Sequence, residues 1–384
     1  MESLHVRGVG FIQWIQQFQY LDSLMINTSH LGSPLIAYAL VFPLAYYLNP
    51  TLGLLTMLCA SFTEWFSGLL KWILHGHRPY WWVGLYARKT NTAVMHLEQF
   101  PVTCETGPGS PSGHCMITLA SLVPLVLYLH QCLLRHTGSK RPSPYGELVL
   151  LIFGLFTLVL GLSRCYLAAH FPHQVLAGVV SGLCFGYFFT HLFQVAQLAS
   201  KPSKSTLNHG MVNYLVYLIR TPGLLIGFGF GSLLLAWMFG WFLQTILGVD
   251  INWSVKLAQR ACRRPEWVHL SSSLMVGFAR IAGYLSGLAI AICLCPPPDR
   301  SLWTPNTNLS VVPLAVISVI VTKLIEALCR RAVSALLMPI LPPSNSTGPG
   351  VALLASSVVE GSVGPLIAVW VLPSMLGKLG RLHE

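Results

Sequence analysis

The sequence predicts an all-α, polytopic membrane protein with about nine transmembrane helices. Of its 384 residues, 54% are hydrophobic and only 9% are charged, whereas about a quarter of the residues in a soluble domain are charged. Apolar stretches of the roughly 20 residues needed to cross a bilayer recur along the whole chain. No polar segment is long enough for a separate domain, so we expect residues 1–384 to form a single integral membrane domain.

Hydropathy places the nine helices in order along the chain. The longest polar connections between them are 76–112, 198–221 and 248–271. The expected helices cover residues 31–48, 52–75, 113–134, 147–168, 173–197, 222–247, 272–295, 309–335 and 350–374.

The distribution of basic residues indicates how the chain is oriented. The connections 135–146 and 198–221 and the C-terminal tail are basic with hardly an acidic residue, so the positive-inside rule makes their side cytosolic. With an odd number of spans, the N-terminus, the connections 76–112 and 248–271 and the turn at 164–172 then lie in the lumen. Because 248–271 is also basic, the charges favour this orientation without requiring it.

The net charge of +11 would suggest a nucleic-acid partner in a soluble protein. Here the lysines and arginines lie in loops and at the ends of apolar segments, where orientation in the membrane and phosphate binding explain them better. We therefore expect membrane lipid, but no nucleic acid, around this protein. The sequence also contains no Walker A motif and no G-x-G-x-x-G fingerprint, so nucleotide binding has no support.

Two of the ten cysteines, Cys104 and Cys262, lie in polar connections, whereas most of the others fall in apolar stretches and pack like small hydrophobic residues. Cys104 and Cys262 could pair if both face an oxidising lumen. Cysteine spacing does not fix connectivity, so the sequence leaves this pairing open.

The first group of candidate site residues lies where the second helix ends, in EWFSGLLKWILHGHRPYWW. Lys71 and Arg78 are seven residues apart, almost two helical turns, and would project from nearly the same face of a helix. Pro79 would stop the helix and fix where the Arg78 guanidinium is delivered. Taken singly, each cation could instead be a membrane-surface anchor beside aromatic residues.

The second group is ETGPGSPSGHCM, just before the third helix. Ser112 is a good N-cap, and Gly113 lets a backbone N–H approach a ligand at a helix terminus whose dipole attracts anions. His114 adds a titratable imidazole. The alternative is an ordinary loop followed by a structural histidine at a helix end.

The third group is SRCYLAAHFPHQVLAG, between the fourth and fifth helices. Arg164 lies at the lumenal end of one helix, and His170 comes two residues before Pro172, which is well suited to begin the next. The alternative here is a basic turn at the membrane interface.

The three groups together indicate a phosphate site, since independent anchors have no reason to meet on one lumenal surface. Arginine, lysine and backbone N–H groups bind phosphate, and one histidine can attack phosphorus while the other protonates the departing oxygen. The twelve acidic residues are scattered, with no D-x-D or H-E-x-x-H motif. The sequence therefore favours a metal-independent reaction that needs no cofactor.

In this order, K-x6-R-P (71–79), P-S-G-H (111–114) and S-R-x5-H (163–170) resemble the signature of the type 2 phosphatidic acid phosphatase (PAP2) and vanadium haloperoxidase superfamily. The segments RPYWWV, QFPVTCETGPGSPSGHCM, SRCYLAAHFPHQVLAG and CRRPEWVHL are similar to the glucose-6-phosphatase catalytic subunit family, over about residues 63–270. PSGHCMIT, HFPHQVLAG and the N-terminal Met-Glu-Ser look more like the ubiquitously expressed subunit of that family than the liver one.

This resemblance implies a nine-span protein of the endoplasmic reticulum with a lumenal active site. It implies a PAP2-type catalytic core at about 52–197, followed by additional transmembrane helices in 198–384. His170 would be the nucleophile that forms a phosphohistidine, and His114 would protonate the sugar oxygen and later act as the base that activates water. The phosphoryl oxygens would be held by Lys71, Arg78, Ser112, Gly113 and Arg164.

One position departs from the wider superfamily, which has an aspartate four residues after the nucleophilic histidine. This chain has Gln174 there, as the glucose-6-phosphatase family does. An amide can accept a hydrogen bond from imidazole but cannot offset a positive charge. Glu105 is a candidate for the missing charge, and its alternative is a solvated loop residue.

We therefore expect hydrolysis of glucose 6-phosphate, or a close sugar phosphate, to the sugar and phosphate. A lumenal site for a cytosolic metabolite also implies functional coupling to a glucose-6-phosphate transporter. Two alternatives stay open. A lipid phosphate phosphatase would use the same residues, and a transporter or inactive scaffold could use Lys323 and Glu326, one turn apart in the eighth helix, as a pair inside the bundle.

Overall fold

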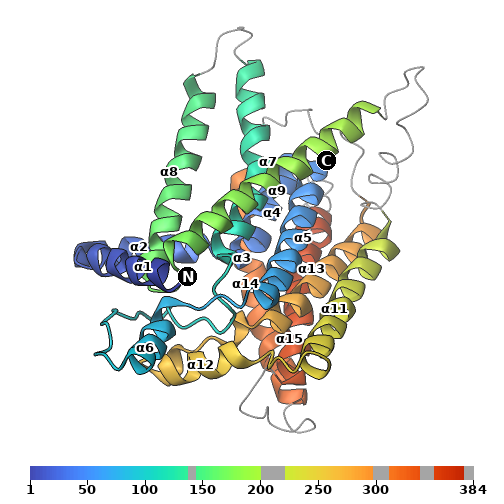
Figure 1. Ribbon diagram of the computed structural model, residues 1–384. Helices are drawn as coiled ribbons and strands as arrows, with labels where there is room; N and C mark the ends of the chain where they lie inside the picture. The colour runs from blue at the N-terminus through green and yellow to red at the C-terminus, as the bar shows by residue number, and fades with distance from the viewer. Residues whose placement is uncertain (137–143, 200–220, 297–310, 338–349, 376–384) are drawn as a thin grey trace, which may run out of the picture.

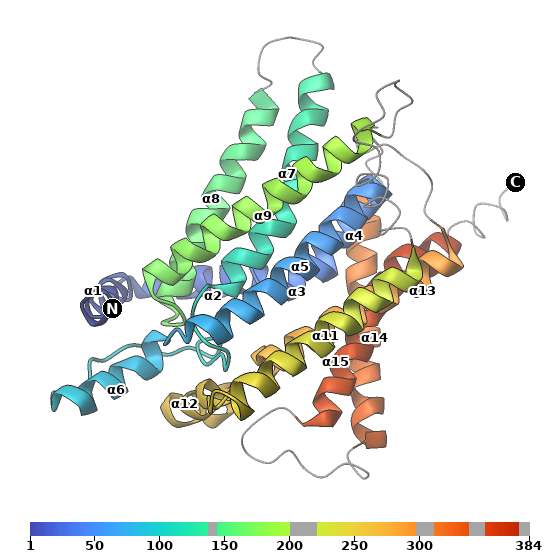
Figure 2. The same ribbon diagram turned by 45° about the vertical axis from the view of Figure 1, so that its right-hand side comes forward.

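The computed structural model describes residues 1–136, 144–199, 221–296, 311–337 and 350–375. Within these ranges the regular secondary structure is helical, and the long helices form one bundle (Figures 1 and 2). Eight helices are long and apolar enough to cross a membrane, and a bent pair of helical segments, 19–31 and 34–48, would make a ninth. The predicted all-α, multi-pass membrane fold is confirmed.

The observed helices follow the predicted ranges closely. The bent pair contains α2 (Asp22–Leu31), α3 (Pro34–Ile36) and α4 (Phe42–Leu48), joined at a 50° bend. The other membrane-length helices are α5 (Pro50–Leu74), α7 (Gly113–His136), α8 (Pro144–Tyr166), α9 (Pro172–Ala199), α11 (Pro222–Thr245), α13 (Leu274–Leu294), α14 (Val311–Leu337) and α15 (Val351–Leu366).

Three shorter helices, α1 (Glu2–Ile15), α6 (Pro79–Thr90) and α12 (Trp253–Ala261), gather at one end of the bundle (Figure 1). The side chain of Gln16 joins α1 to the α8–α9 turn through Tyr166 O (2.6 Å) and to the loop before α7 through Glu98 O (3.0 Å). The segments expected on the lumenal side therefore share one face. The connection 137–143, most of 198–221 and the tail beyond 375, expected on the other side, lie outside the described residues.

The end of α5 agrees with the hydropathy range within one residue, but the predicted continuation of this helix to Arg78 is wrong. Asn49 caps the start of α5 by accepting from the N–H of Thr51 (2.9 Å), but the helix stops at Leu74, where His75 adopts a left-handed conformation. Arg78 therefore lies in extended backbone and does not share a helical face with Lys71. Pro79 begins α6 rather than ending α5.

Close packing of α7 against α9 depends on three glycines spaced four residues apart on α9. A Cβ atom at Gly178 would lie 2.6 Å from the carbonyl oxygen of Ser112, and one at Gly182 would lie 2.6 Å from that of Met116. A Cβ at Gly186 would be equally close to Val123. This contact fixes the start of α7 against the turn that precedes α9, and these are the segments that carry the two candidate histidines.

The outer helices carry exposed apolar side chains, as expected for lipid contact. On α8 these include Leu151, Leu155 and Leu158. On α14, Lys323 Nζ and Glu326 Oε2 are 2.7 Å apart, but the Lys323 side chain is 48% exposed. The two residues do pair, although the lysine lies on the outside of α14 rather than inside the bundle as the transporter alternative assumed.

Candidate active site

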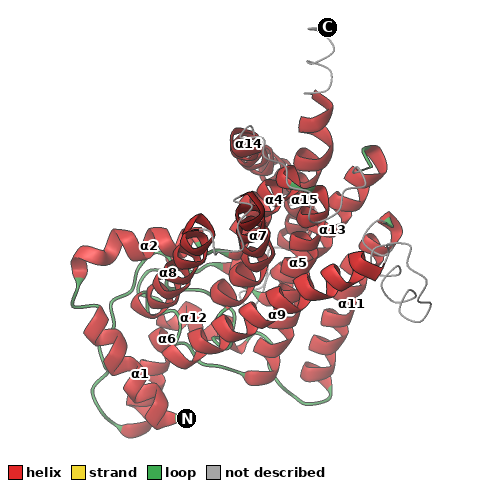
Figure 3. Ribbon diagram, turned by 90° about the horizontal axis from the view of Figure 1, so that it is seen from above, coloured by secondary structure: helices red, strands yellow, loops and turns green. Residues whose placement is uncertain are grey.

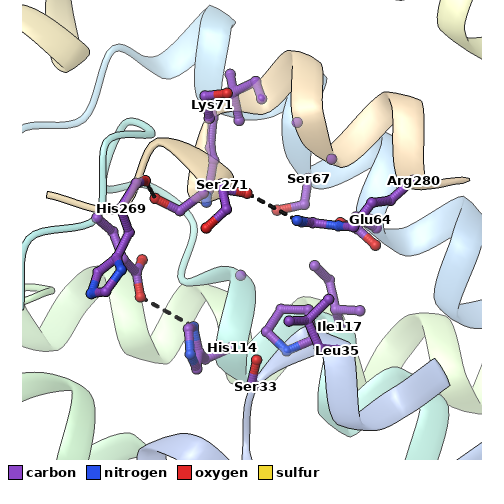
Figure 4. Close-up of a pocket in the computed structure, with 18 of the residues that line it drawn as sticks. Ser33, Leu35, Glu64, Ser67, Lys71, His114, Ile117, His269, Ser271 and Arg280 are labelled. Atoms are coloured by element: carbon purple, nitrogen blue, oxygen red, sulfur yellow. Dashed lines mark hydrogen bonds and ion pairs between the residues drawn. The ribbon is translucent and has the colours of Figure 1, made fainter. Parts of the chain in front are cut away.

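The candidate site lies at the end of the bundle where α5 and α8 end and α7 begins. Figure 3 shows these three helices from above, with α7 between α8 and α5. A cavity of about 210 Å³ opens there, with Lys71 and His114 on opposite walls (Figure 4). The structure brings the three predicted groups together, because Arg164 and Gly113 line the same cavity and Arg78 and His170 contact one another beside it.

The carboxylate of Glu105 lies at the centre of these groups. Its Oε2 is 2.9 Å from Nη1 of Arg78, and its Oε1 forms an ion pair with Nη2 of Arg164. His114 Nδ1 is 3.5 Å from Oε1, and His170 Nε2 is 3.9 Å from Oε2. Four groups that were predicted to bind, attack or protonate the substrate thus converge on the Glu105 carboxylate. The sequence analysis named Glu105 only as a candidate for the missing negative charge.

Electrostatics hold this carboxylate in its charged form. Burial alone would raise the pKa of Glu105, but the guanidinium groups of Arg164 and Arg78 outweigh that effect and keep the pKa well below its usual range. Both guanidiniums are almost completely buried. Glu105 therefore supplies a negative charge that partly offsets two buried positive charges.

Backbone carbonyls fix the orientation of Arg78. Its Nε donates to the carbonyl of Gly107 (2.7 Å), its Nη2 to that of Pro108 (3.4 Å) and its Nη1 to that of Ala169 (3.1 Å). Arg164 is held by the hydroxyl of Ser29 on α2, at 2.5 Å from Nη1. The guanidiniums are positioned before any ligand arrives.

The hydrogen bonds of His170 define its tautomer. Its Nδ1 is 2.7 Å from the carbonyl oxygen of Gly109, which can only accept, so Nδ1 carries the proton. Its Nε2 is 3.2 Å from Nη1 of Arg78, which can only donate, so Nε2 presents a lone pair. Burial, reinforced by Arg78 and Arg164, places the pKa of His170 well below its ordinary value. The hydrogen bonds and the lowered pKa both favour a neutral imidazole, whose Nε2 lone pair accepts from Arg78 and can act as a nucleophile.

Gln174 does not orient His170, in contrast to the hydrogen bond considered from the sequence. Its side-chain amide donates to the carbonyl of His77 (2.7 Å) and accepts from the N–H of Phe171 (3.1 Å). The Gly109 carbonyl takes the role that an aspartate would have. Position 109 must be glycine, because a Cβ there would lie 2.6 Å from the His77 carbonyl oxygen and 2.9 Å from the Gln174 amide.

Of the remaining predicted residues, Lys71 and Gly113 line the cavity and Ser112 does not. A Cβ at Gly113 would lie 3.3 Å from Nζ of Lys71. Ser112 immediately precedes α7, and its carbonyl accepts from the N–H of Met116 (2.9 Å), which fits the N-cap position. Its side chain is fully buried and is not part of the cavity wall.

A disulfide braces the loop that carries Glu105. Cys104 and Cys262 are bonded, which settles the pairing that the sequence left open. Two hydrogen bonds reinforce the disulfide: the N–H of His269 donates to the Cys104 carbonyl (3.1 Å), and that of Thr106 donates to Ser272 Oγ (2.9 Å). The 262–273 segment thus holds Glu105 against the arginines.

The sequence interpretation missed two parts of this site. It considered Gly113 alone, for a backbone N–H contact with an anion, and missed that the carbonyls of Gly107 and Gly109 hold Arg78 and His170. It also missed Glu64 and Arg280, which line the far end of the cavity. Glu64 lies seven residues before Lys71 on α5, and the 3.6-residue period would have placed both on one face.

Among the described residues, histidines, cysteines and carboxylates form no group of three or more able to hold a metal ion.

Comparison with known proteins shows the family of the chain. Residues 50–197 match the PAP2 superfamily model. The chain is 36% identical over 296 residues to glucose-6-phosphatase 3 of Bos taurus and of Homo sapiens, an alignment that covers 76% of this chain and 77% of each relative. This chain belongs to the glucose-6-phosphatase family.

Within the glucose-6-phosphatase family, two named kinds of protein are similarly close to this chain. Glucose-6-phosphatase catalytic subunit 1 of Mus musculus is also 36% identical, over 298 residues that cover 76% of each protein. The identities therefore do not favour one kind over the other. No solved structure matches the chain.

Proposed function

We propose that this protein hydrolyses glucose 6-phosphate, or a close sugar phosphate, to the sugar and inorganic phosphate through a phosphohistidine at His170. The observation that carries the proposal is the convergence of Arg78, Arg164, His114 and Nε2 of His170 on one anionic position, taken here by the Glu105 carboxylate. The names of the relatives supply the sugar phosphate as the substrate.

In the first step, the lone pair of His170 Nε2 attacks phosphorus and the bond from phosphorus to the sugar oxygen breaks. His114 gives a proton to that oxygen, so glucose leaves as a neutral alcohol. The phosphoryl oxygens are held by Lys71, Arg78 and Arg164, with the N–H groups at the start of α7 nearby. The Gly109 carbonyl keeps the proton of His170 on Nδ1 throughout.

In the second step, water attacks the phosphohistidine. His114, now without its proton, accepts one from the water, and the phosphorus–nitrogen bond breaks with its electron pair returning to Nε2. Inorganic phosphate and neutral His170 result, and both histidines recover their starting states. In the intermediate the phosphoryl group takes the anionic position beside the arginines, which Glu105 occupies in the empty site at 3.9 Å from Nε2.

We further propose that the site faces the lumen of the endoplasmic reticulum, with the N-terminus lumenal and the C-terminus cytosolic. Supporting this orientation, the Cys104–Cys262 disulfide lies on the same face as the site, and disulfides persist in oxidising compartments. A lumenal site needs a transporter to deliver a cytosolic sugar phosphate. After reduction of the disulfide, a membrane-impermeant thiol reagent should label these cysteines only in opened vesicles. Labelling in sealed vesicles would show that the site faces the cytosol and contradict the proposed orientation.

Acid-quench trapping tests the chemistry. Purified protein mixed with glucose 6-phosphate labelled in its phosphate should retain an acid-labile, base-stable label, and His170→Ala should retain none. His130→Ala is the matched control, because His130 is a partly buried histidine on α7 outside the cavity wall. A label that survives in His170→Ala would contradict the proposal. Faster turnover of phosphatidic acid than of glucose 6-phosphate would support a lipid phosphatase instead.

A further inference from the structure

The cavity continues beyond Lys71 and His114 to a second polar group, which Figure 4 shows around Glu64, Ser67 and Arg280. Glu64 lies seven residues from Lys71 on α5, or about 10 Å along the same helix face. A hexose extended from its phosphate can bridge this distance. Arg280 reaches the cavity from α13, 216 residues from Glu64 in the sequence.

Several polar atoms at this end are buried without a hydrogen-bond partner among the described residues. They include the hydroxyls of Ser67 and Ser273, which are 2% and 6% exposed and line the cavity, and Nε of Arg280. Buried polar atoms in folded proteins are nearly always satisfied by protein, water or ligand. Their presence along one cavity wall indicates a ligand rich in hydrogen-bonding groups.

The carboxylate of Glu64 has unused capacity to accept. Its Oε2 accepts from the hydroxyl of Tyr38 at 2.8 Å. Its Oε1 is 3.5 Å from Nη2 of Arg280, which is long for a charge-assisted hydrogen bond. Arg280 is anchored through Nη1 to the Ser271 carbonyl at 2.9 Å. Two neighbouring hydroxyl groups on the cavity side of this pair would engage both residues, one donating to Glu64 and the other accepting from Arg280.

The shape of this end also suits a sugar. Gly277 leaves room beside the carboxylate, because a Cβ there would lie 3.2 Å from Oε1 of Glu64. Leu35, Ile117 and Phe278 form an apolar part of the wall that can cover the C–H face of a ring. An acyl chain in the same place would leave the charged pair facing hydrocarbon.

We propose that Glu64, Arg280 and Ser67 form a hydroxyl-binding subsite that holds the sugar of the substrate, while the Lys71 end of the cavity holds the phosphoryl group. This inference rests on the proposed function and deepens it. It makes Glu64 and Ser67 specificity-determining residues for the sugar.

The test compares glucose 6-phosphate with p-nitrophenyl phosphate, a phosphate monoester without a polyol. The measured quantity is the ratio of kcat/KM for the sugar phosphate to kcat/KM for the aryl phosphate. We expect Glu64→Gln to lower this ratio about 30-fold, because a hydrogen bond to a charged group is lost. Ser67→Ala should lower it about 5-fold, as expected for a neutral hydrogen bond.

Ser67→Ala separates binding from folding, because the Ser67 hydroxyl has no hydrogen-bond partner to lose in the part of the chain that the structure describes. Glu326→Gln is the matched control, a carboxylate on α14 that pairs with Lys323 outside the cavity wall. Ratios within two-fold of wild type in both cavity variants would overturn the subsite and leave the proposed function intact. A wild-type protein that hydrolyses p-nitrophenyl phosphate but not glucose 6-phosphate would overturn both.

Discussion

Removing the Glu105 carboxylate should destabilise the empty site and make it bind oxyanions more tightly. In Glu105→Ala, the buried guanidiniums of Arg78 and Arg164 lose their shared counter-charge. Two unit charges 2.9 Å apart, the separation of the Arg78–Glu105 pair, attract by about 6 kcal/mol at an effective dielectric constant of about 20. Desolvation and relaxation reduce this value, and deleting one partner of a buried pair typically costs about 3–5 kcal/mol. We expect a loss of stability in that range.

An oxyanion should restore part of this loss. Orthovanadate resembles phosphate in charge and shape, and in the wild type it must displace the Glu105 carboxylate from the arginines. In Glu105→Ala that competition is gone, so we expect its dissociation constant to fall about tenfold, or about 1.4 kcal/mol. At vanadate concentrations that saturate both proteins, this difference of about 1.4 kcal/mol adds to the stabilisation of the folded variant by the ligand.

Thermal unfolding of the purified protein, followed by the fluorescence of its eleven tryptophans, measures both effects. Without ligand, Glu105→Ala should melt several degrees below wild type, and vanadate should raise its melting temperature more than it raises that of wild type. Glu98→Ala is the control, since Glu98 pairs with Arg263 in the same region but is 46% exposed. If Glu105→Ala has the same melting temperature as the wild type, or if vanadate raises both melting temperatures equally, the reasoning is refuted.

Three further predictions concern the groups around this centre. The pKa of His170 lies well below 6.5, and only its neutral form attacks. After correction for the substrate's own ionisation near pH 6, kcat/KM should therefore decline only well below pH 6.5, since protonation of the general acid His114 can only raise it as pH falls. An acid limb centred near 6.5 would contradict this. Gly109→Ala should lower kcat at least about 100-fold, because the added methyl group displaces the carbonyl that orients His170, whereas Gly84→Ala on α6, where a Cβ meets nothing within 4 Å, should behave as wild type in the same assay. Cys104→Ser and Cys262→Ser should each cost about 2–5 kcal/mol in unfolding experiments, and the double variant should be no less stable than either single one.

Much of the helical fold follows from local sequence signals. Hydropathy located the membrane-length helices, and proline at the first position marks the starts of α5, α8, α9 and α11. The hydropathy range of this helix ends at His75 and agrees with the end of α5 at Leu74. The motif argument nevertheless continued the helix to Arg78, because the left-handed turn at His75 leaves no compositional signal. That one error altered the expected relation between Lys71 and Arg78.

The site residues that stand in short motifs could be predicted from the sequence. Arg78, His114, Arg164 and His170 stand in motifs, and the topology brings those motifs to one end of the bundle. The position of Glu105 depends on a loop held by a disulfide across 158 residues, and Glu64 meets Arg280 across 216 residues. Contacts between such distant residues are set by the packing of the whole bundle. This packing cannot be read from a single sequence.

The carbonyls of Gly107, Pro108 and Gly109 bear on how this protein tolerates change. They hold Arg78 and His170 through atoms that every amino acid possesses, so the loop contributes through its path rather than through its side chains. Scanning mutagenesis that swaps one side chain for another would register the glycines as steric requirements and overlook Pro108 altogether. Replacing single peptide bonds by esters, which weakens one carbonyl acceptor at a time, would instead measure what this loop contributes to the attacking imidazole.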